Sequence, residues 1–400
     1  MLRSIAIAVT LASAAVAAPQ GTPSAAKPAA PAPVAQDKPS KPQPAGARLE
    51  AQLAQELRAG GGATGVNVAI GQGTEDVNGY TPEVSAEVKR FPEYLPKVPP
   101  FKGSLRLDGS SSMAGLLGAL GRSYESVYPD VKVEVKQGGS SSGLAALRAG
   151  TCDMAAVSRD LTQAEVAEIE AATGLKVFQV PVALDAVCVF VNRSNVLPTI
   201  TREQLNGIFS ITHSLTKDPI LRWSDLDPKS PLGDQMMPIY MLSISHGTMQ
   251  EFMRWAMPDE GLQTITRREE VSPSAVVNAC CAYRTAIGLA GYANRQPRAR
   301  MLPVSPGTGQ AAVAPSFRTI RDRSYPMWRP LNLVVLAKDE ASVPPMCMDF
   351  LRFVWSESGQ DTVATLKAVV TDLDRPPALM RDSVQRPYTA NPAPASAPAR

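Results

Sequence analysis

The sequence predicts an α/β fold in which ligand-binding groups gather where strands end. Short apolar strands alternate with amphipathic helices from residue 104 onward, and this alternation is typical of a sheet flanked by helices. The first three strands also end in hydroxyl-bearing residues, two of them at the start of a helix. In an open α/β sheet, ligands bind just beyond the carboxyl ends of the strands.

The chain is long enough for two domains and has the composition of an ordinary globular protein. Its 400 residues are 44% hydrophobic and 19% charged. The formal net charge of +3 is too small to indicate nucleic acid or an anionic membrane as a partner. After the N-terminal leader, no apolar run is long enough to span a bilayer.

The two ends of the chain are predicted to lie outside the folded part. Residues 1–17 have the pattern of a secretory signal peptide, with a positive charge, an apolar stretch and a small-residue cleavage site. No cysteine follows that site, so we expect a periplasmic or secreted protein without a lipid anchor. The other predicted segments are a Pro/Ala-rich disordered linker at 18–48, an N-terminal extension with a short helix and strand at 49–100, and a disordered tail at 375–400.

A βαβα run opens the folded part. Its strands are expected at 104–107, 131–136 and 154–157, and the loops that follow them at 108–112, 138–143 and 158–159. The helix after the first loop has apolar residues at helical spacing, which are Met113, Leu116, Leu117, Leu120, Tyr124 and Val127.

Serine-rich loops at helix starts indicate an oxyanion ligand. The first turn of a helix carries unpaired N–H groups and the positive end of the helix dipole, so it attracts negative charge. Serine hydroxyls can donate to a bound oxyanion there, and glycine lets the backbone approach it closely. The alternative is that Ser112 and Ser142 are ordinary helix caps, which two similar loops in one run make less attractive.

The second half of the chain repeats this opening pattern. A strand at 239–242 ends in a loop at 243–248 that begins a helix. The segment 183–191 is almost continuously apolar, as expected for a strand buried on both faces, and Thr201 is predicted to cap a helix over 202–209. Further strands are expected at 178–182, 286–292 and 329–336, and further helices at 163–173, 274–282, 345–353 and 360–366.

The order of these motifs resembles the phosphate-binding proteins of Pst-type ABC importers. The motifs are Gly-Ser-Ser-Ser-Met at 109–113, Gly-Ser-Ser-Ser-Gly at 139–143, Gly-Thr-Cys-Asp at 150–153, Ser-Arg at 158–159, Val-Ala-Leu-Asp-Ala-Val-Cys-Val-Phe-Val-Asn at 182–192, Leu-Asn-Gly-Ile-Phe-Ser at 205–210, Phe-Leu-Arg-Phe-Val at 350–354 and Ser-Gly-Gln at 358–360. Each motif is weak alone, and the specificity of the resemblance lies in their order over residues 102–370.

The resemblance implies a type II periplasmic binding protein with two α/β lobes, each a mixed sheet flanked by helices, that close over an oxyanion in the cleft between them. Lobe I would consist of 101–184 and 326–374 and lobe II of 185–325, with hinges near 182–185 and between 301 and 328. The implied partners are phosphate, or a similar tetrahedral oxyanion, and the membrane permease of an ABC importer. The protein would be a monomer without cofactor, metal or nucleic acid, and it would not be an enzyme.

Carried over residue by residue, the resemblance implies a ligand site built from four segments. These are Ser110, Ser111, Ser112 and the Met113 amide in the first loop, Ser140 and Ser141 in the second, Ser158 and Arg159 after the third strand, and His246, Gly247 and Thr248 in the second lobe.

The site departs from the family pattern at its positive charge. Leu242 stands where the family has an arginine that grips the anion, and we expect its side chain at the mouth of the cleft. His246 stands in place of a family serine. Arg159 and a protonated His246 are the two candidates for the missing charge.

The site also lacks a carboxylate that the family has. In the family, this carboxylate accepts the proton of hydrogen phosphate. The matching positions here are Ser111 and Ser158. A hydroxyl can donate as well as accept, so we expect weak discrimination between phosphate and sulfate unless Asp108 or Asp185 takes over this role. Together with the absent arginine, this predicts weaker phosphate binding than in relatives that carry both groups.

Two other kinds of function are weighed against phosphate capture. Serines near a histidine suggest a hydrolase, but the chain contains only His213 and His246, and no carboxylate is evidently placed to orient His246. Neither histidine has a partner at metal-ligand spacing. The main alternative is a binding-protein fold that serves as an envelope or surface scaffold, or as a sensor, with a degenerate ligand site.

The cysteines carry little functional information. There are five of them, so at least one thiol does not form an intramolecular disulfide. Cys152 and Cys188 are the two that could meet, and packing in the core is the default expectation for each cysteine.

Overall fold

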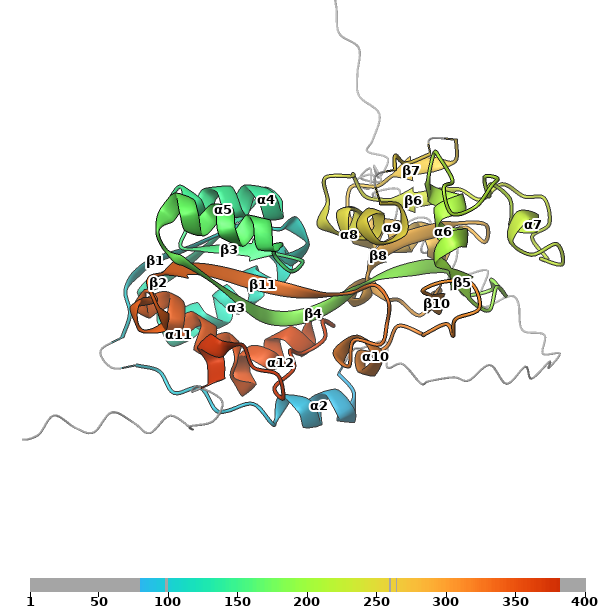
Figure 1. Ribbon diagram of the computed structural model, residues 1–400. Coiled ribbons are helices and arrows are strands. Elements are labelled where there is room, and N and C mark those ends of the chain that lie inside the picture. The colour runs from blue at the N-terminus through green and yellow to red at the C-terminus, as the bar shows by residue number, and fades with distance from the viewer. Residues whose placement is uncertain (1–79, 98–99, 259, 264, 382–400) are drawn as a thin grey trace, which may run out of the picture. The chain divides into compact units, whose positions relative to one another are not determined.

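The computed structural model describes residues 80–97, 100–258, 260–263 and 265–381 (Figure 1). All of these residues belong to one compact unit. The predicted signal peptide, the linker, and the helix and strand expected before residue 71 lie outside the described residues. Within the described ranges, no helix is both long and apolar enough to cross a bilayer.

A mixed sheet flanked by helices forms one half of the fold. Its strands lie in the order β2 (Val131–Gln137), β1 (Gly103–Gly109), β3 (Met154–Val157), β11 (Trp328–Ala337) and β4 (Lys176–Asn192). β1 pairs in parallel with β2 and β3, whereas β11 pairs antiparallel with β3 and β4. The helices of this half are η1 (Ser111–Met113), α3 (Ala114–Val127), α4 (Ser140–Arg148), α5 (Gln163–Thr173), η3 (Glu340–Ser342), α11 (Pro345–Val354) and α12 (Glu357–Thr365). The predicted βαβα run is confirmed.

A second set of strands extends from the other half of β4. β8 (Ile287–Gly291) and β9 (Ala299–Met301) pair antiparallel with β4, and β6 (Ile239–Met241) lies in parallel between β8 and β7 (Arg267–Glu269). A separate ladder consists of β5 (Ile200–Thr201) and β10 (Val304–Ser305). The helices of this half are α6 (Arg202–Phe209), α7 (Trp223–Leu226), α8 (Gly247–Ala256), α9 (Pro273–Ala282), η2 (Tyr292–Asn294) and α10 (Phe317–Arg321). Thr201 caps α6 as predicted, since its hydroxyl oxygen accepts from the Gln204 amide at 3.2 Å.

β4 belongs to both halves and is one continuous strand of 17 residues, where the sequence predicted two strands. Figure 1 shows β4 and β11 running side by side between the two halves. Val182 has no partner in β11, because the register shifts between Leu331 and Asn332. Pro181 lacks an amide hydrogen, so an irregularity is tolerated at this point of the ladder. The first predicted hinge, 182–185, coincides with this bulge.

Two large apolar clusters form the cores and define two lobes. One cluster includes Leu105 and Tyr124 and lies around the β2-β1-β3-β11 part of the sheet. The other includes Phe190 and Phe252 and lies around β8 and β6. We call the parts of the chain around these clusters the first lobe and the second lobe. Residues 187–191 of β4 are fully buried in the second lobe, as predicted for a strand covered on both faces.

The described ends of the chain both pack into the first lobe. In α2 (Pro82–Val88) both valines are buried there, together with Phe91. The tail predicted to be disordered after residue 375 instead includes η4 (Ala378–Met380), whose leucine and methionine are also buried. Isolated apolar residues in Pro-rich segments show no periodicity, so burial could not be predicted from them.

The structure places Cys152 and Cys188 in separate apolar clusters. Cys152 packs with Leu144 and Leu147 in the first lobe, whereas Cys188 lies in the core of the second lobe. The two residues therefore form no disulfide, contrary to the pairing considered from the sequence.

Candidate functional site

Serines of the first lobe form a hydroxyl cluster at the carboxyl ends of β1 and β3. The Oγ atoms of Ser110 and Ser112 lie 2.8 Å apart, and the Ser110 hydroxyl donates to Ser158 Oγ at 3.0 Å. Ser140, at the start of α4, joins them because its Oγ accepts from the Ser158 amide at 3.3 Å. We call Ser110, Ser112, Ser140 and Ser158 the serine cluster. It lies at the edge of the sheet where a ligand was predicted.

Two glycines allow the loops of the serine cluster to approach one another. Gly109 has a φ of +142°, which favours glycine over all other residues. A methyl group built on Gly143 would lie 2.6 Å from the carbonyl oxygen of Asp108, so α4 can pack this closely on the end of β1 only without a side chain there. The Ser110 amide donates to the Ala156 carbonyl at 2.9 Å, which places the first loop beside the end of β3.

The serines are not the helix caps that the sequence left as an alternative. The N-cap positions of η1, α3 and α4 make no side-chain hydrogen bond to the helix. Ser112 belongs to η1, and Ser142 lies inside α4, where its hydroxyl donates to the Gly139 carbonyl at 2.9 Å. A helix start without a side-chain cap keeps free N–H groups, and these can donate to a bound oxyanion.

The second lobe contributes the start of α8 to the same place. His246 is the N-cap of this helix, and its Nδ1 accepts from the Thr248 amide at 3.2 Å. A methyl group built on Gly247 would lie 2.6 Å from Ser158 Oγ and 3.4 Å from Ser112 Oγ. The loops that the sequence singled out in each lobe therefore meet across the cleft.

His246 is uncharged at neutral pH. Burial, together with the nearby Arg329 guanidinium, lowers the pKa of His246 to about 4, against the opposing effect of Asp185. A protonated His246 is therefore not the source of the charge that the family obtains from its arginine.

Arg159, the other candidate for that charge, is engaged within the first lobe. Its two terminal nitrogens donate to the two carboxylate oxygens of Glu165 at 2.8 and 2.6 Å. This ion pair lowers the pKa of Glu165 to about 2. Arg159 borders a cavity of about 100 Å³ whose other lining residues are Ser140, Ser158, Gly247, Gln250, Glu251 and Arg254.

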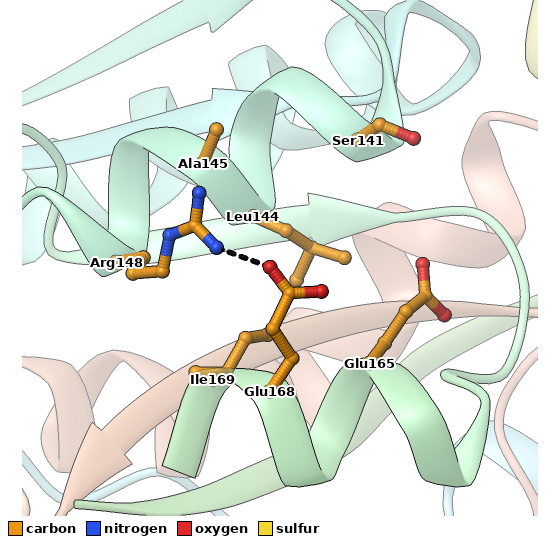
Figure 2. A pocket seen from close by; sticks show the side chains of 7 residues that line it. All are labelled: Ser141, Leu144, Ala145, Arg148, Glu165, Glu168 and Ile169. Atoms are coloured by element: carbon orange, nitrogen blue, oxygen red, sulfur yellow. Dashed lines mark hydrogen bonds and ion pairs between the residues drawn. The ribbon is translucent and has the colours of Figure 1, made fainter. Parts of the chain in front are cut away.

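Met113, Ser111 and Ser141, also predicted for the first lobe, do not line this cavity. The Met113 amide donates to the Ser110 carbonyl at 3.0 Å, and the Met113 side chain is in the core. Ser111 is half-buried in η1. Ser141 is exposed and lines a different pocket between α4 and α5, in which Arg148 and Glu168 form an ion pair (Figure 2).

Leu242 is a core residue, contrary to its expected position at the mouth of the cleft. Its side chain is 2% exposed and belongs to the apolar cluster of the second lobe. Ile244, two residues further along the same loop, is 56% exposed. Leu242 directly follows β6, and at this point the chain still runs through the covered part of the second lobe.

A buried ion pair lies beside α8, and its arginine was not predicted from the sequence. Asp185 on β4 and Arg329 on β11 are directly opposite each other in the antiparallel ladder. Nε and Nη2 of Arg329 donate to Asp185 Oδ2 at 3.1 and 2.7 Å, and Nη2 also donates to Thr248 Oγ1 at 3.1 Å. Each of the two is a charged residue within an otherwise apolar strand segment. Because charged residues are rarely buried without a partner, this pattern could have indicated a buried ion pair.

The assembled site has the chemistry of an oxyanion receptor. It combines serine hydroxyls, the start of a ten-residue helix and a buried guanidinium, all of which donate hydrogen bonds or present positive charge. In the described part of the chain, no three His, Cys, Asp or Glu side chains are grouped so that they could hold a metal ion.

Both protein sequences and solved structures include relatives of this chain. The phosphate-binding proteins PstS of Pseudomonas aeruginosa and Staphylococcus epidermidis are 26% identical over 286 residues and 27% identical over 266 residues, which is 71% and 65% of this chain and 88% and 76% of theirs. A possible phosphate binding protein of Planctomyces limnophilus is 22% identical with a TM-score of 0.56, over 71% of this chain and 98% of that one. An ABC-type phosphate transport receptor of Vibrio cholerae is 21% identical with a TM-score of 0.53, over 67% and 100%.

The family is shown by a match that extends through both lobes. The model of the PBP superfamily domain matches residues 96–358, which is more than half of the chain. The two solved structures share the overall fold. The chain therefore belongs to the PBP superfamily and has the α/β fold of a type II periplasmic binding protein.

Proposed function

We propose that this protein captures phosphate, or a similar tetrahedral oxyanion, between its two lobes and delivers it to the membrane permease of an ABC importer. The observation that carries the proposal is the contact between the serine cluster and the start of α8 across the cleft. The names of the curated relatives support phosphate as the ligand. In this function the protein acts as a monomer, either in the periplasm or after secretion.

The donors of the cleft suit a tetrahedral anion better than a flat or neutral ligand. The serine cluster approaches from the first lobe and the helix start from the second, so the donors converge from two sides. Four oxygens arranged around one atom can accept from both sides at once. Donors that are already in place need little reorganisation when the anion arrives, which favours binding.

The same geometry supports a binding protein rather than a hydrolase. The string Gly-Ser-Ser-Ser-Gly at 139–143 also matches a nucleophile motif, but its central Ser141 is exposed and lines another pocket. His246 uses Nδ1 to cap α8, so this nitrogen does not donate to an orienting carboxylate as in a catalytic triad.

Phosphate is expected to bind the purified mature protein in a saturable, one-to-one manner. We expect a dissociation constant between about 1 μM and 1 mM, because the family arginine position is leucine here and truncating a charged donor costs about 2–5 kcal/mol. Isothermal titration calorimetry measures this constant, and the thermal midpoint should rise with phosphate concentration because the ligand binds the folded state. If neither phosphate, sulfate nor arsenate binds at millimolar concentration, the scaffold or sensor alternative is favoured instead.

Replacing Gly247 with alanine is expected to weaken phosphate binding by about tenfold or more. The added methyl would lie 2.6 Å from Ser158 Oγ, so the lobes must separate or the hydroxyl must move. Overpacking a close contact typically costs about 1–3 kcal/mol. The matched control is Gly115→Ala in the first turn of α3, where a methyl would meet nothing within 4 Å, and this variant should bind as the wild type does. Equal affinity in both variants would show that the ligand is not enclosed at this contact.

A further inference from the structure

We propose that Arg329 is an anion-binding residue of the cleft, that its guanidinium donates to the captured oxyanion through Nη1, and that Asp185 is the residue that positions it. The proposal rests on the proposed function and identifies the cationic donor that the loop before α8 lacks. Arg329 reaches the site from β11 instead, from the pair of strands that runs between the lobes.

The hydrogen bonds of Arg329 leave one nitrogen unused. Nε and Nη2 are satisfied by Asp185 and Thr248, but Nη1 has no hydrogen-bond partner among the described residues. The residue is 1% exposed, so bulk water does not replace that partner. A buried guanidinium N–H group without an acceptor is costly, and a ligand oxygen would remove this cost.

The position of Arg329 brings its guanidinium to the helix start already described. Nη2 contacts Thr248, the second residue of α8, and the preceding Gly247 is the residue that approaches the serine cluster. Arg329 and the serine cluster therefore approach the same helix start. Arg329 approaches it from β11, and the serine cluster approaches it from the first lobe. An anion bound at this helix start would therefore have donors on two sides.

Asp185 holds the guanidinium in this orientation. It lies directly opposite Arg329 in the ladder and accepts two of its hydrogen bonds on the single oxygen Oδ2. A guanidinium carries its donors in a rigid fork, so binding one edge to Asp185 determines where Nη1 points. The other arginines of the cleft are arranged differently: Arg159 places both terminal nitrogens on Glu165, and Arg254 is paired with Glu251 at the exposed rim.

The experiment compares phosphate affinities of folded variants by calorimetry, beginning with the wild type. Arg329→Met removes the donor and keeps the length of the side chain. Because it leaves Asp185 buried without its partner, the double variant Arg329→Met with Asp185→Asn removes both charges together, so that no uncompensated charge stays buried. We expect both variants to bind phosphate about ten- to a hundredfold more weakly, which is the usual effect of losing one hydrogen bond to a charged group.

The control is Arg300→Met, a half-buried arginine. Its Nη2 donates to the Asn195 carbonyl at 2.9 Å and its Nε has no partner among the described residues, but it lies on β9 in the second lobe, outside the serine cluster. This variant should bind phosphate as the wild type does. If the wild type binds phosphate and the folded double variant binds it within threefold of that affinity, Arg329 is structural and this inference is overturned alone. If the wild type binds no oxyanion, the proposed function is overturned, and this inference with it.

Discussion

Replacing Leu242 with arginine is expected to destabilise the protein by about 4 kcal/mol and to bring no gain in phosphate affinity. From the family pattern alone, this change would restore an anion-binding arginine. In the structure, however, Leu242 is 2% exposed and packs in the apolar core of the second lobe. A guanidinium there would be buried without a partner, and an uncompensated buried charge typically costs about 3–5 kcal/mol.

Urea unfolding of Leu242→Arg measures this loss, with Ile244→Arg as the matched control. Ile244 belongs to the same loop but is 56% exposed, so the same new charge should change the free energy of unfolding by no more than about 0.5 kcal/mol. The contrary result would be a Leu242→Arg protein of wild-type stability that binds phosphate more tightly. It would mean that the side chain at 242 faces the cleft.

The fold was predictable where local periodicity and capping act. The apolar spacing from Met113 to Val127 indicated α3, and the capping hydroxyl of Thr201 marked the start of α6. The continuous apolar run at 183–191 indicated a strand covered on both faces. By contrast, β7 and β9 have three residues each, too few to show any period, and neither was predicted.

The candidate site was predictable in its loops but not in its buried charges. The serines follow strands of the βαβα run, so local order places them at one edge of the sheet. Arg329 and Asp185 are 144 residues apart, and only the register of β11 against β4 brings them together. The family motif likewise pointed to the loop between β6 and α8, but it could not show that the Leu242 side chain points into the core.

Gly109→Ala is expected to lower the free energy of unfolding by about 3 kcal/mol or more. Two effects add at this residue. Its φ of +142° strains any residue with a side chain, at a cost of about 1–3 kcal/mol. A methyl group would also lie 2.2 Å from the carbonyl oxygen of Ala156, which belongs to the neighbouring strand backbone and cannot turn away. Overpacking of this kind costs about a further 1–3 kcal/mol.

Gly103→Ala separates these two effects, because Gly103 lies at the other end of the same strand. Its φ is +106°, yet a methyl there would meet nothing within 4 Å, so this variant should show the strain alone, about 1–3 kcal/mol. In Gly109→Ala, displacement of the Ala156 carbonyl should also break its hydrogen bond from the Ser110 amide, which places the first loop beside β3. We therefore expect this variant to lose phosphate affinity at temperatures where it is still folded, whereas Gly103→Ala retains it. Equal stabilities of the two variants in urea unfolding would contradict the close approach of β1 and β3 on which the serine cluster depends.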